Sequence, residues 1–229
     1  VVRALSDRPV PATADLYCLG GGEDGPQTQA ANALAAEGAL ARALAGGAAV
    51  LAVCAGFQIV GEAFAGTAGA LHPGAGLLDV RSHKGTGPRA VGELLVKAGP
   101  AVGLASGAEL LTGYENHGGV TERGPGVAPL GRVMAGVGNG VGDRGEGAVA
   151  GRVVGTYLHG PVLARNPALA DHLLSLVVGD LDPLEDPEVE DLRAERLGAV
   201  HAQGHDRRWG RPQGGWRPRR ALARGRGHH

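Results

Sequence analysis

Apolar runs alternate with longer helical patterns over the first third of the chain. Residues 15–21 ("DLYCLGG") and 48–53 ("AAVLAV") are short and apolar, which predicts buried strands. The Ala/Leu-rich segment 28–45 predicts a helix closed by Gly46 and Gly47, and residues 56–64 ("GFQIVGEAF") predict another. A strand–helix–strand–helix order predicts an α/β fold, with a mostly parallel sheet and helices on both faces.

Glycine interrupts the pattern between residues 75 and 155. Short β-rich runs occur there at "GLLDV", "AVGELLV", "LLTGYENH", "PLGRVMA" and "AVAGRVVGTYLH". Such runs predict an antiparallel β extension of the main sheet.

The last third of the body predicts two helices. One covers "NPALADHLLSLVV", with Asn166 and Pro167 at cap and first-turn positions, and the other covers 187–200. Residues 201–229 have no apolar periodicity and predict a disordered tail. We therefore divide the chain into a domain over 1–200 and an Arg/Gly-rich tail over 201–229.

Composition favours a cytoplasmic protein. The chain has 229 residues, 43% of them hydrophobic, which is enough for a core. No apolar run approaches the length of a membrane span, and the first residues do not resemble a signal peptide. The two cysteines form no disulfide framework, as expected in a reducing compartment.

The formal net charge of −1 conceals an asymmetry along the chain. Residues 201–229 hold eight Arg and one acidic residue, Asp206, which leaves 14 basic and 22 acidic residues in 1–200. The body is therefore acidic and the tail basic. We interpret the tail as a solvated end, and we expect no nucleic-acid partner.

Cys54 stands where a predicted buried strand turns into a helix ("VCAGFQ"). That edge of a parallel sheet is where sites form, and a helix N-terminus lowers the pKa of a thiol. Ala55 and Gly56 are small enough for a crowded turn, and the N–H after the cysteine would face an oxyanion. Cys54 is thus a candidate nucleophile. The alternative is a buried structural cysteine, which is our interpretation of the mid-strand Cys18.

A thiol nucleophile needs a base, and the chain has nine histidines. His159 ends the apolar run "VVGTYLH", so it is expected at the same sheet edge as Cys54. His117, in "GYENHGG", is the second candidate, as a polar residue near the site. We interpret His72, His83 and His172 as solvated or packed side chains.

Three glycines after the first strand ("LGGGED") allow a backbone to approach a ligand closely. An ordinary glycine-rich turn is the alternative. The chain contains no P-loop and no dinucleotide fingerprint in a strand–helix context, which argues against a nucleotide site.

Four motifs together resemble class I glutamine amidotransferases of the CobB/CobQ-like type. They are "LYCLGGGEDGPQ", "AVCAGFQIVGE", "GYENHGG" and "GTYLHGPVLARNPALAD", and they occur in the family's order. The last two favour the GatD-type glutaminase subunits of lipid II isoglutaminyl synthase. The resemblance covers about residues 1–200 and implies a flavodoxin-like amidotransferase domain.

The resemblance implies a role for each matched residue. Cys54 would attack the side-chain amide of glutamine and His159 would act as base. The N–H groups of Gly21, Gly22 and Ala55 would form the oxyanion hole. The resemblance further implies that two residues bind the substrate: Gln58, one helical turn after the nucleophile, and Arg89, which would hold the α-carboxylate.

Two features depart from the wider class I pattern. His159 is followed by Gly160 and Pro161, so the carboxylate of the usual H-x-E pattern is missing. Glu115 or a carboxylate of a partner subunit could replace it. The family's first strand and helix also have no counterpart before "VVRAL".

The resemblance implies a glutaminase subunit that supplies ammonia to a MurT-type, ATP-dependent ligase in a heterodimer. The ligase would amidate D-glutamate of lipid II in peptidoglycan synthesis. The chemistry on this chain would need no cofactor and no metal. The alternatives are the amidotransferase half of a cobyric-acid-type synthase and an inactive binding subunit.

Overall fold

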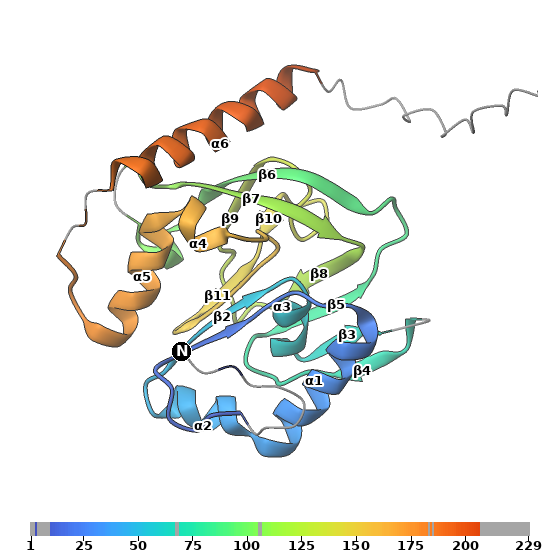
Figure 1. The fold of residues 1–229 in the computed structure, drawn as a ribbon. Coiled ribbons are helices and arrows are strands. Elements are labelled where there is room, and N and C mark those ends of the chain that lie inside the picture. The colour runs from blue at the N-terminus through green and yellow to red at the C-terminus, as the bar shows by residue number, and fades with distance from the viewer. Residues whose placement is uncertain are drawn as a thin grey trace, which may run out of the picture.

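The central sheet has four strands in the order β1–β2–β12–β11 in the computed structural model (Figure 1). The structure describes residues 3, 10–66, 69–104, 107–182, 184 and 186–206. Strands β1 (Leu16–Leu19), β2 (Ala49–Val53) and β12 (Val153–Thr156) run parallel, and β11 (Ala148–Ala150) is antiparallel to β12. The predicted mostly parallel sheet is confirmed.

Alternate residues of β2 face two different hydrophobic cores. Val50 and Ala52 belong to the core formed with α1–α3, whereas Leu51 belongs to the core formed with α5 and the β6–β7–β9 sheet. Because both faces of the strand are covered, it is apolar throughout and lacks a polar alternation. This is the two-faced arrangement that the sequence predicted.

The predicted helix over 28–45 is two helices in the structure. Helix α1 (Asp24–Glu37) ends at Gly38, which has φ 56°, and α2 (Ala39–Ala45) follows at once. The prediction of one helix was wrong at this point because a left-handed glycine ends the helical hydrogen-bond ladder. Figure 1 shows both helices below the central sheet.

The predicted helix over 56–64 is shorter than expected. Helix α3 (Ala55–Val60) ends at Gly61, and Ala63–Ala65 form strand β3. A Cβ at position 61 would lie 2.7 Å from the carbonyl oxygen of Val80, so glycine permits close contact with the next sheet. Pairing of β3 with two other strands outweighs the local helical pattern.

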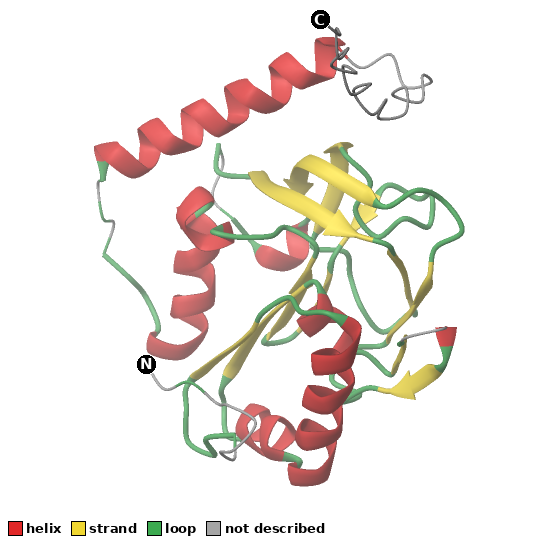
Figure 2. Ribbon diagram, turned by 45° about the vertical axis from the view of Figure 1, so that its right-hand side comes forward, coloured by secondary structure: helices red, strands yellow, loops and turns green. Residues whose placement is uncertain are grey.

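Two further four-stranded sheets form the predicted extension (Figure 2, strands in yellow); their strand pairs are antiparallel except for one parallel pair in the second sheet. One has the order β10–β9–β6–β7 and contains β6 (Ala90–Ala98), β7 (Leu110–His117), β9 (Gly131–Ala135) and β10 (Gly145–Glu146). The other has the order β4–β3–β5–β8 and adds β4 (Leu71–Pro73), β5 (Val80–Lys84) and β8 (Gly119–Arg123). A short 3₁₀ helix, η2 (Pro100–Val102), follows β6.

The predicted run "GLLDV" contributes only Val80 to a strand, since β5 begins there. Leu78 is buried in the core but precedes the paired segment. Hydrophobic burial, and not strand pairing, accounts for the apolar character of that run.

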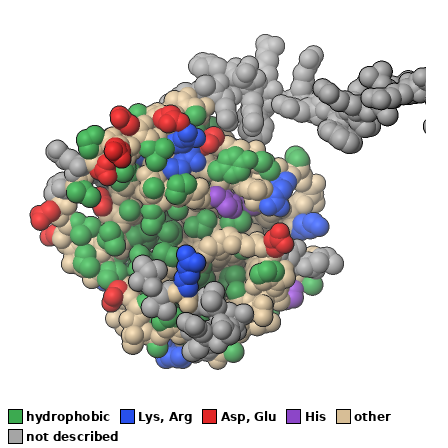
Figure 3. Space-filling model, in the orientation of Figure 1, with side chains coloured by type: hydrophobic (Ala, Val, Ile, Leu, Met, Phe, Trp, Pro, Cys, Tyr) green, Lys and Arg blue, Asp and Glu red, His purple; other side chains and the backbone are tan. Residues whose placement is uncertain are grey.

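Three helices complete the chain: α4 (Val162–Arg165), α5 (Pro167–Val178) and α6 (Pro187–Asp206). Asn166 precedes α5, but its side chain bonds to the backbone of Thr112 and Val162 instead of capping the helix. In Figure 3, acidic side chains gather at the upper left, near the start of α6.

Helix α6 continues through the boundary predicted at residue 200, so residues 201–206 do not belong to a disordered tail. The rest of the predicted tail, 207–229, lies outside the described residues. Within the described part of the chain, no helix has the length and apolar character needed to cross a membrane.

Gly155 offers a test of this packing, because a Cβ there would overlap the ring of Phe57. We expect Gly155→Ala to lower the free energy of unfolding by about 1–3 kcal/mol through overpacking. The control is Gly198→Ala in α6, where a Cβ meets nothing within 4 Å and should stabilise the protein by up to about 1 kcal/mol. Urea unfolding measures both, and equal effects would contradict the packing described.

Candidate active site

Cys54 occupies the turn between β2 and α3. Its backbone angles, φ 54° and ψ −109°, are sparsely populated for a non-glycine residue and store strain. The turn is fixed on two sides. The Cys54 N–H donates to the Thr156 carbonyl over 2.9 Å, and a Cβ at Gly56 would lie only 2.6 Å from the Leu19 carbonyl oxygen. Glycine is therefore required where α3 passes β1.

His159 follows the end of β12, beside β2. Its N–H donates to the Tyr114 carbonyl over 2.9 Å, which ties this segment to β7. A Cβ built at Gly21 would lie 3.4 Å from Cβ of Cys54 and 3.7 Å from Nε2 of His159. The ends of β1, β2 and β12 therefore bring Gly21, Cys54 and His159 together, as the parallel order of these strands requires.

The hydrogen bond at the other ring nitrogen determines the tautomer of His159. Its Nδ1 lies 3.0 Å from the Tyr157 carbonyl oxygen, which can only accept a proton. Nδ1 therefore carries the hydrogen of the neutral ring, and Nε2, the nitrogen that faces Gly21, makes no hydrogen bond in the described structure and has a free lone pair. This tautomer suits a general base acting on the thiol.

The pKa of the Cys54 thiol differs from the sequence-based expectation. Burial raises this pKa above its ordinary value, and the opposing effects of the Ala55 N–H and the Arg89 charge are smaller. The expectation of a lowered pKa was wrong, because α3 has only six residues and the thiol is largely desolvated. The resting nucleophile is a thiol that needs a base.

The residues predicted for an oxyanion hole lie around this thiol. The Ala55 N–H is directed at the Cys54 sulfur, as its effect on the thiol pKa indicates. Gly21 lies against Cys54, and Gly22 lines the adjoining pocket. Gly21 and Ala55 thus lie beside the nucleophile and come from two different loops.

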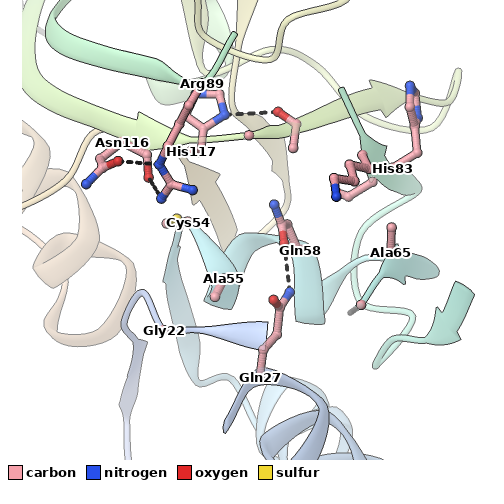
Figure 4. Close-up of a pocket in the computed structure, with 15 residues that line it drawn as sticks. Gly22, Gln27, Cys54, Ala55, Gln58, Ala65, His83, Arg89, Asn116 and His117 are labelled. Atoms are coloured by element: carbon pink, nitrogen blue, oxygen red, sulfur yellow. Dashed lines mark hydrogen bonds between the residues drawn. The ribbon is translucent and has the colours of Figure 1, made fainter. Parts of the chain in front are cut away.

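A pocket of about 280 Å³ opens next to Cys54. Its described lining includes two cations, Lys84 and Arg89, and no carboxylate. The Arg89 guanidinium donates from Nε to Asn116 Oδ1 over 2.6 Å and from Nη2 to the Asn116 carbonyl over 2.8 Å. Figure 4 shows this fixed guanidinium above Cys54, where it can bind an anionic group of a ligand.

Gln58 lines the pocket, but neighbouring side chains already hold its amide. Gln27 Nε2 donates to Gln58 Oε1 over 2.7 Å, and Gln58 Nε2 donates to the Tyr157 hydroxyl over 3.0 Å. The Tyr157 hydroxyl also contacts Thr121 Oγ1 at 2.6 Å, and Thr121 contacts Ser82 at 2.7 Å. Gln58 therefore belongs to a polar network in the floor of the pocket (Figure 4).

His117 also lines the pocket, but among the described residues no hydrogen bond or ion pair joins it to Cys54 or His159. Its ring stacks on Tyr157 with centroids 3.8 Å apart, and its Nδ1 lies 2.9 Å from the Gly119 carbonyl. Its Nε2 lies 3.7 Å from a Glu115 carboxylate oxygen. This arrangement fits the predicted supporting role of His117.

Glu115 does not supply the carboxylate missing from the H-x-E pattern. It accepts hydrogen bonds from the N–H groups of Val137 and Gly138 at 2.9–3.1 Å. Among the described residues, no carboxylate oxygen lies within 4 Å of a His159 ring nitrogen.

The other cysteine and the other histidines considered in the sequence lie outside the pocket, except for His83. Cys18 is exposed in the middle of β1, so its interpretation as a buried cysteine was wrong. His72 stacks on Phe64, and His172 is half-buried on α5. His83, interpreted as solvated, lines the pocket. The described residues contain no cluster of His, Cys, Asp or Glu suited to hold a metal ion.

Comparison with known proteins identifies the family of this chain. The profile of the CobB/CobQ-like glutamine amidotransferase domain matches residues 2–167. The chain belongs to this family. A crystal structure of a glutamine amidotransferase covers 72% of this chain and 79% of its own at a TM-score of 0.53. At 21% identity, that likeness supports the fold alone, and the predicted amidotransferase fold class is confirmed.

Among curated relatives, the chain is similar to GatD subunits of lipid II isoglutaminyl synthase. It is 34% identical to the Staphylococcus aureus subunit over 161 residues, which are 70% of this chain and 62% of that protein. It is 30% identical to the Streptococcus pneumoniae subunit, with 80% and 69% covered. A cobyric acid synthase of Limosilactobacillus reuteri is 33% identical, and 34% of its length is covered. The resemblance to GatD is confirmed.

Glu146 of β10 is a fully buried carboxyl group behind His159, and no sequence signal pointed to it. Its Oε1 accepts hydrogen bonds from the Tyr157 N–H at 2.6 Å and from Thr156 Oγ1 at 2.8 Å. Its Oε2 has no partner in the described structure. Burial is the main cause that raises the pKa of Glu146 to about 7.

This raised pKa predicts how stability changes with pH. The folded state holds the proton up to about pH 7, whereas an ordinary glutamate loses it near 4.5. The stabilisation is thus complete below about pH 4.5 and is lost as pH rises through about 7.

Relative to Glu146→Gln, we expect the wild-type protein to lose roughly 3 kcal/mol of unfolding free energy between pH 5 and pH 8.5. Urea unfolding at the two pH values measures the difference. Glu122→Gln, at an exposed position of β8, is the control. A pH-independent difference for the Glu146 variant would contradict the burial of an ionisable carboxyl.

Proposed function

We propose that this chain is the glutaminase subunit of a two-subunit amidotransferase. It hydrolyses L-glutamine to glutamate and ammonia, and the ammonia passes to a MurT-type, ATP-dependent ligase. The observation that carries the proposal is the meeting of Cys54, His159 and Gly21 beside a cationic pocket. Similarity to GatD subunits supports the acceptor, D-glutamate of lipid II in peptidoglycan synthesis.

The first chemical step uses Cys54 and His159. His159 Nε2 takes the thiol proton as the sulfur attacks the side-chain amide carbon of glutamine. The tetrahedral intermediate carries its negative charge on the former carbonyl oxygen. Collapse transfers the proton from His159 to the leaving nitrogen, so ammonia departs and a thioester remains. Water, deprotonated by His159, then releases glutamate and restores the thiol.

The backbone donors around Cys54 stabilise the oxyanion. The N–H groups of Ala55, Gly21 and Gly22 are the proposed donors, and they belong to two different loops. An N–H fixed before the reaction needs no reorganisation when charge develops, which is why such donors lower the barrier. The strained backbone of Cys54 keeps the sulfur exposed to the pocket.

Arg89 is the proposed ligand of the glutamine α-carboxylate. The Asn116 contacts hold the guanidinium in place before substrate binds, which reduces the entropy lost on binding. Gln58 and its polar network shape the floor of the pocket and present hydrogen-bonding groups to the substrate. The glutaminase chemistry on this chain uses no cofactor and no metal.

The proposal places the protein in the cytoplasm as one half of a heterodimer, where glutamine and ATP are available. Lipid II contacts the complex through the ligase. A cobyric-acid-type acceptor is the second candidate, supported by the 33% identity to a cobyric acid synthase.

Replacing Cys54 tests the nucleophile. Cys54→Ser should abolish glutamine hydrolysis, whereas Cys18→Ser, in the middle of β1, should retain most of it. Glutaminase assays of the chain alone and with the MurT-type ligase measure both variants. A glutamine-like diazoketone should label Cys54 alone, as read by peptide mass spectrometry. Labelling confined to Cys18 would refute the assignment.

Amidation assays then identify the acceptor. With the ligase, ATP and glutamine, the wild-type chain should support amidation of lipid II, and Cys54→Ser should support it only when ammonia is supplied. Transfer to a cobyric-acid precursor would favour the second candidate. Absence of glutamine hydrolysis with either partner would favour an inactive binding subunit.

Arg89→Lys tests substrate binding. A lysine keeps the charge but cannot form two parallel hydrogen bonds to a carboxylate, so KM for glutamine should rise about tenfold or more. Arg81→Lys is the control, because Arg81 is exposed and pairs with Glu62. Steady-state kinetics compare the two, and an unchanged KM for Arg89→Lys would exclude Arg89 as the carboxylate ligand.

A further inference from the structure

The function proposed above leaves one part of the usual cysteine–histidine machinery unassigned. A carboxylate normally accepts a hydrogen bond from the histidine Nδ1–H and stabilises the imidazolium that forms during catalysis. Here that acceptor is the neutral carbonyl of Tyr157, at 3.0 Å. A carbonyl fixes the tautomer but carries less negative charge than a carboxylate.

A charged group lies two hydrogen bonds and one peptide unit behind this carbonyl. Thr156 Oγ1 donates to Glu146 Oε1 over 2.8 Å and accepts from the Leu158 N–H over 3.0 Å. The Leu158 nitrogen and the Tyr157 carbonyl belong to the same peptide group. The path therefore runs from Glu146 through the Thr156 hydroxyl and this peptide group to Nδ1 of His159.

Each connection in this path can transmit polarisation. Resonance links the nitrogen and the oxygen of a peptide group, so a stronger acceptor at the N–H makes the carbonyl oxygen more negative. Consecutive hydrogen bonds in a low-dielectric interior strengthen one another. Glu146, Thr156, Tyr157 and Leu158 are all fully buried. Water therefore does not screen this path.

A second contact of the same carboxylate fixes the backbone itself. Glu146 Oε1 also accepts the Tyr157 N–H at 2.6 Å, so the carboxylate holds the segment that presents the carbonyl. Glu115, the other buried carboxylate nearby, is engaged by the N–H groups of Val137 and Gly138 and has no such path to His159.

We infer that Glu146 is a positioning residue for His159 and acts on it through Thr156 and the 157–158 peptide group. Once ionised, its carboxylate makes the Tyr157 carbonyl a stronger acceptor for Nδ1–H. The imidazolium formed at His159 is thereby stabilised without direct contact. The inference rests on the proposed glutaminase function for its kinetic consequence, but the effect on His159 exists without substrate.

Two isosteric substitutions interrupt the path at different points. Glu146→Gln removes the charge, and Thr156→Val removes the hydroxyl while the carboxyl stays in place. At pH 8, where the Glu146 carboxyl is mostly ionised, we expect either variant to change the Nδ1 nitrogen shift of His159 and to lower kcat for glutamine about tenfold, with KM changed less than about twofold. Thr156→Ser restores the hydroxyl and should restore both values.

Nitrogen-15 NMR of histidine-labelled protein at pH 8 measures the Nδ1 shift and the tautomer of His159, with the signal assigned from its absence in His159→Gln. Thr121→Val is the matched control. It also removes a buried threonine hydroxyl that contacts Tyr157, but the contact is to the phenol and not to the backbone. The Nδ1 shift of His159 should stay unchanged in this control.

A double variant distinguishes a shared path from two separate effects. If Glu146 acts through Thr156, then Glu146→Gln/Thr156→Val should lose no more kcat than the worse single variant. Losses that multiply, or an unchanged Nδ1 shift of His159 in either folded variant, would overturn the inference. Failure of the proposed function is recognised separately, by glutamine hydrolysis that is absent in the wild type or that survives Cys54→Ser.

Discussion

The parallel pairing of β2 with β12 is the constraint on which the site depends. Their register sets Val53 beside Thr156, and the Cys54 N–H donates to the Thr156 carbonyl. One residue thus holds the nucleophile through its carbonyl and supports the base through its hydroxyl. A shift of one residue in this register would turn the side chains of β12 to opposite faces and separate the two halves of the chemistry.

Burying the Glu146 carboxyl against β12 lowers the free energy of unfolding at neutral pH. Glu146 is fully buried, its second oxygen has no partner in the described structure, and its pKa is raised to about 7. A neutral or apolar side chain would stabilise the fold better at neutral pH. Retaining an ionisable group there is reasonable only if its charge is used, and Thr156 and Tyr157 direct that charge toward the site.

Much of this architecture could be predicted from local sequence. The apolar run before Cys54, the glycines after β1 and the end of the "VVGTYLH" run place three site residues at one sheet edge, because parallel strands share that edge. Local patterns failed where tertiary contacts decide. Gly38 splits a continuous helical pattern, and strand pairing after Gly61 shortens α3. Glu146 escaped notice because it lies in a glycine-rich segment without periodicity, and its importance arises only from residues brought close by folding.

The polar network beneath the pocket has a set direction only at its first two bonds, where the Gln27 amide donates to Gln58 and the Gln58 amide donates to the Tyr157 hydroxyl. The Tyr157 hydroxyl then contacts Thr121, and Thr121 contacts Ser82, in pairs in which either oxygen can be the donor. Ser82 lines the pocket, so its hydroxyl can present a proton or a lone pair to a ligand, whereas the Arg89 guanidinium opposite presents only protons. The floor of the pocket therefore adapts to the group that it meets, and the roof selects for oxygen acceptors.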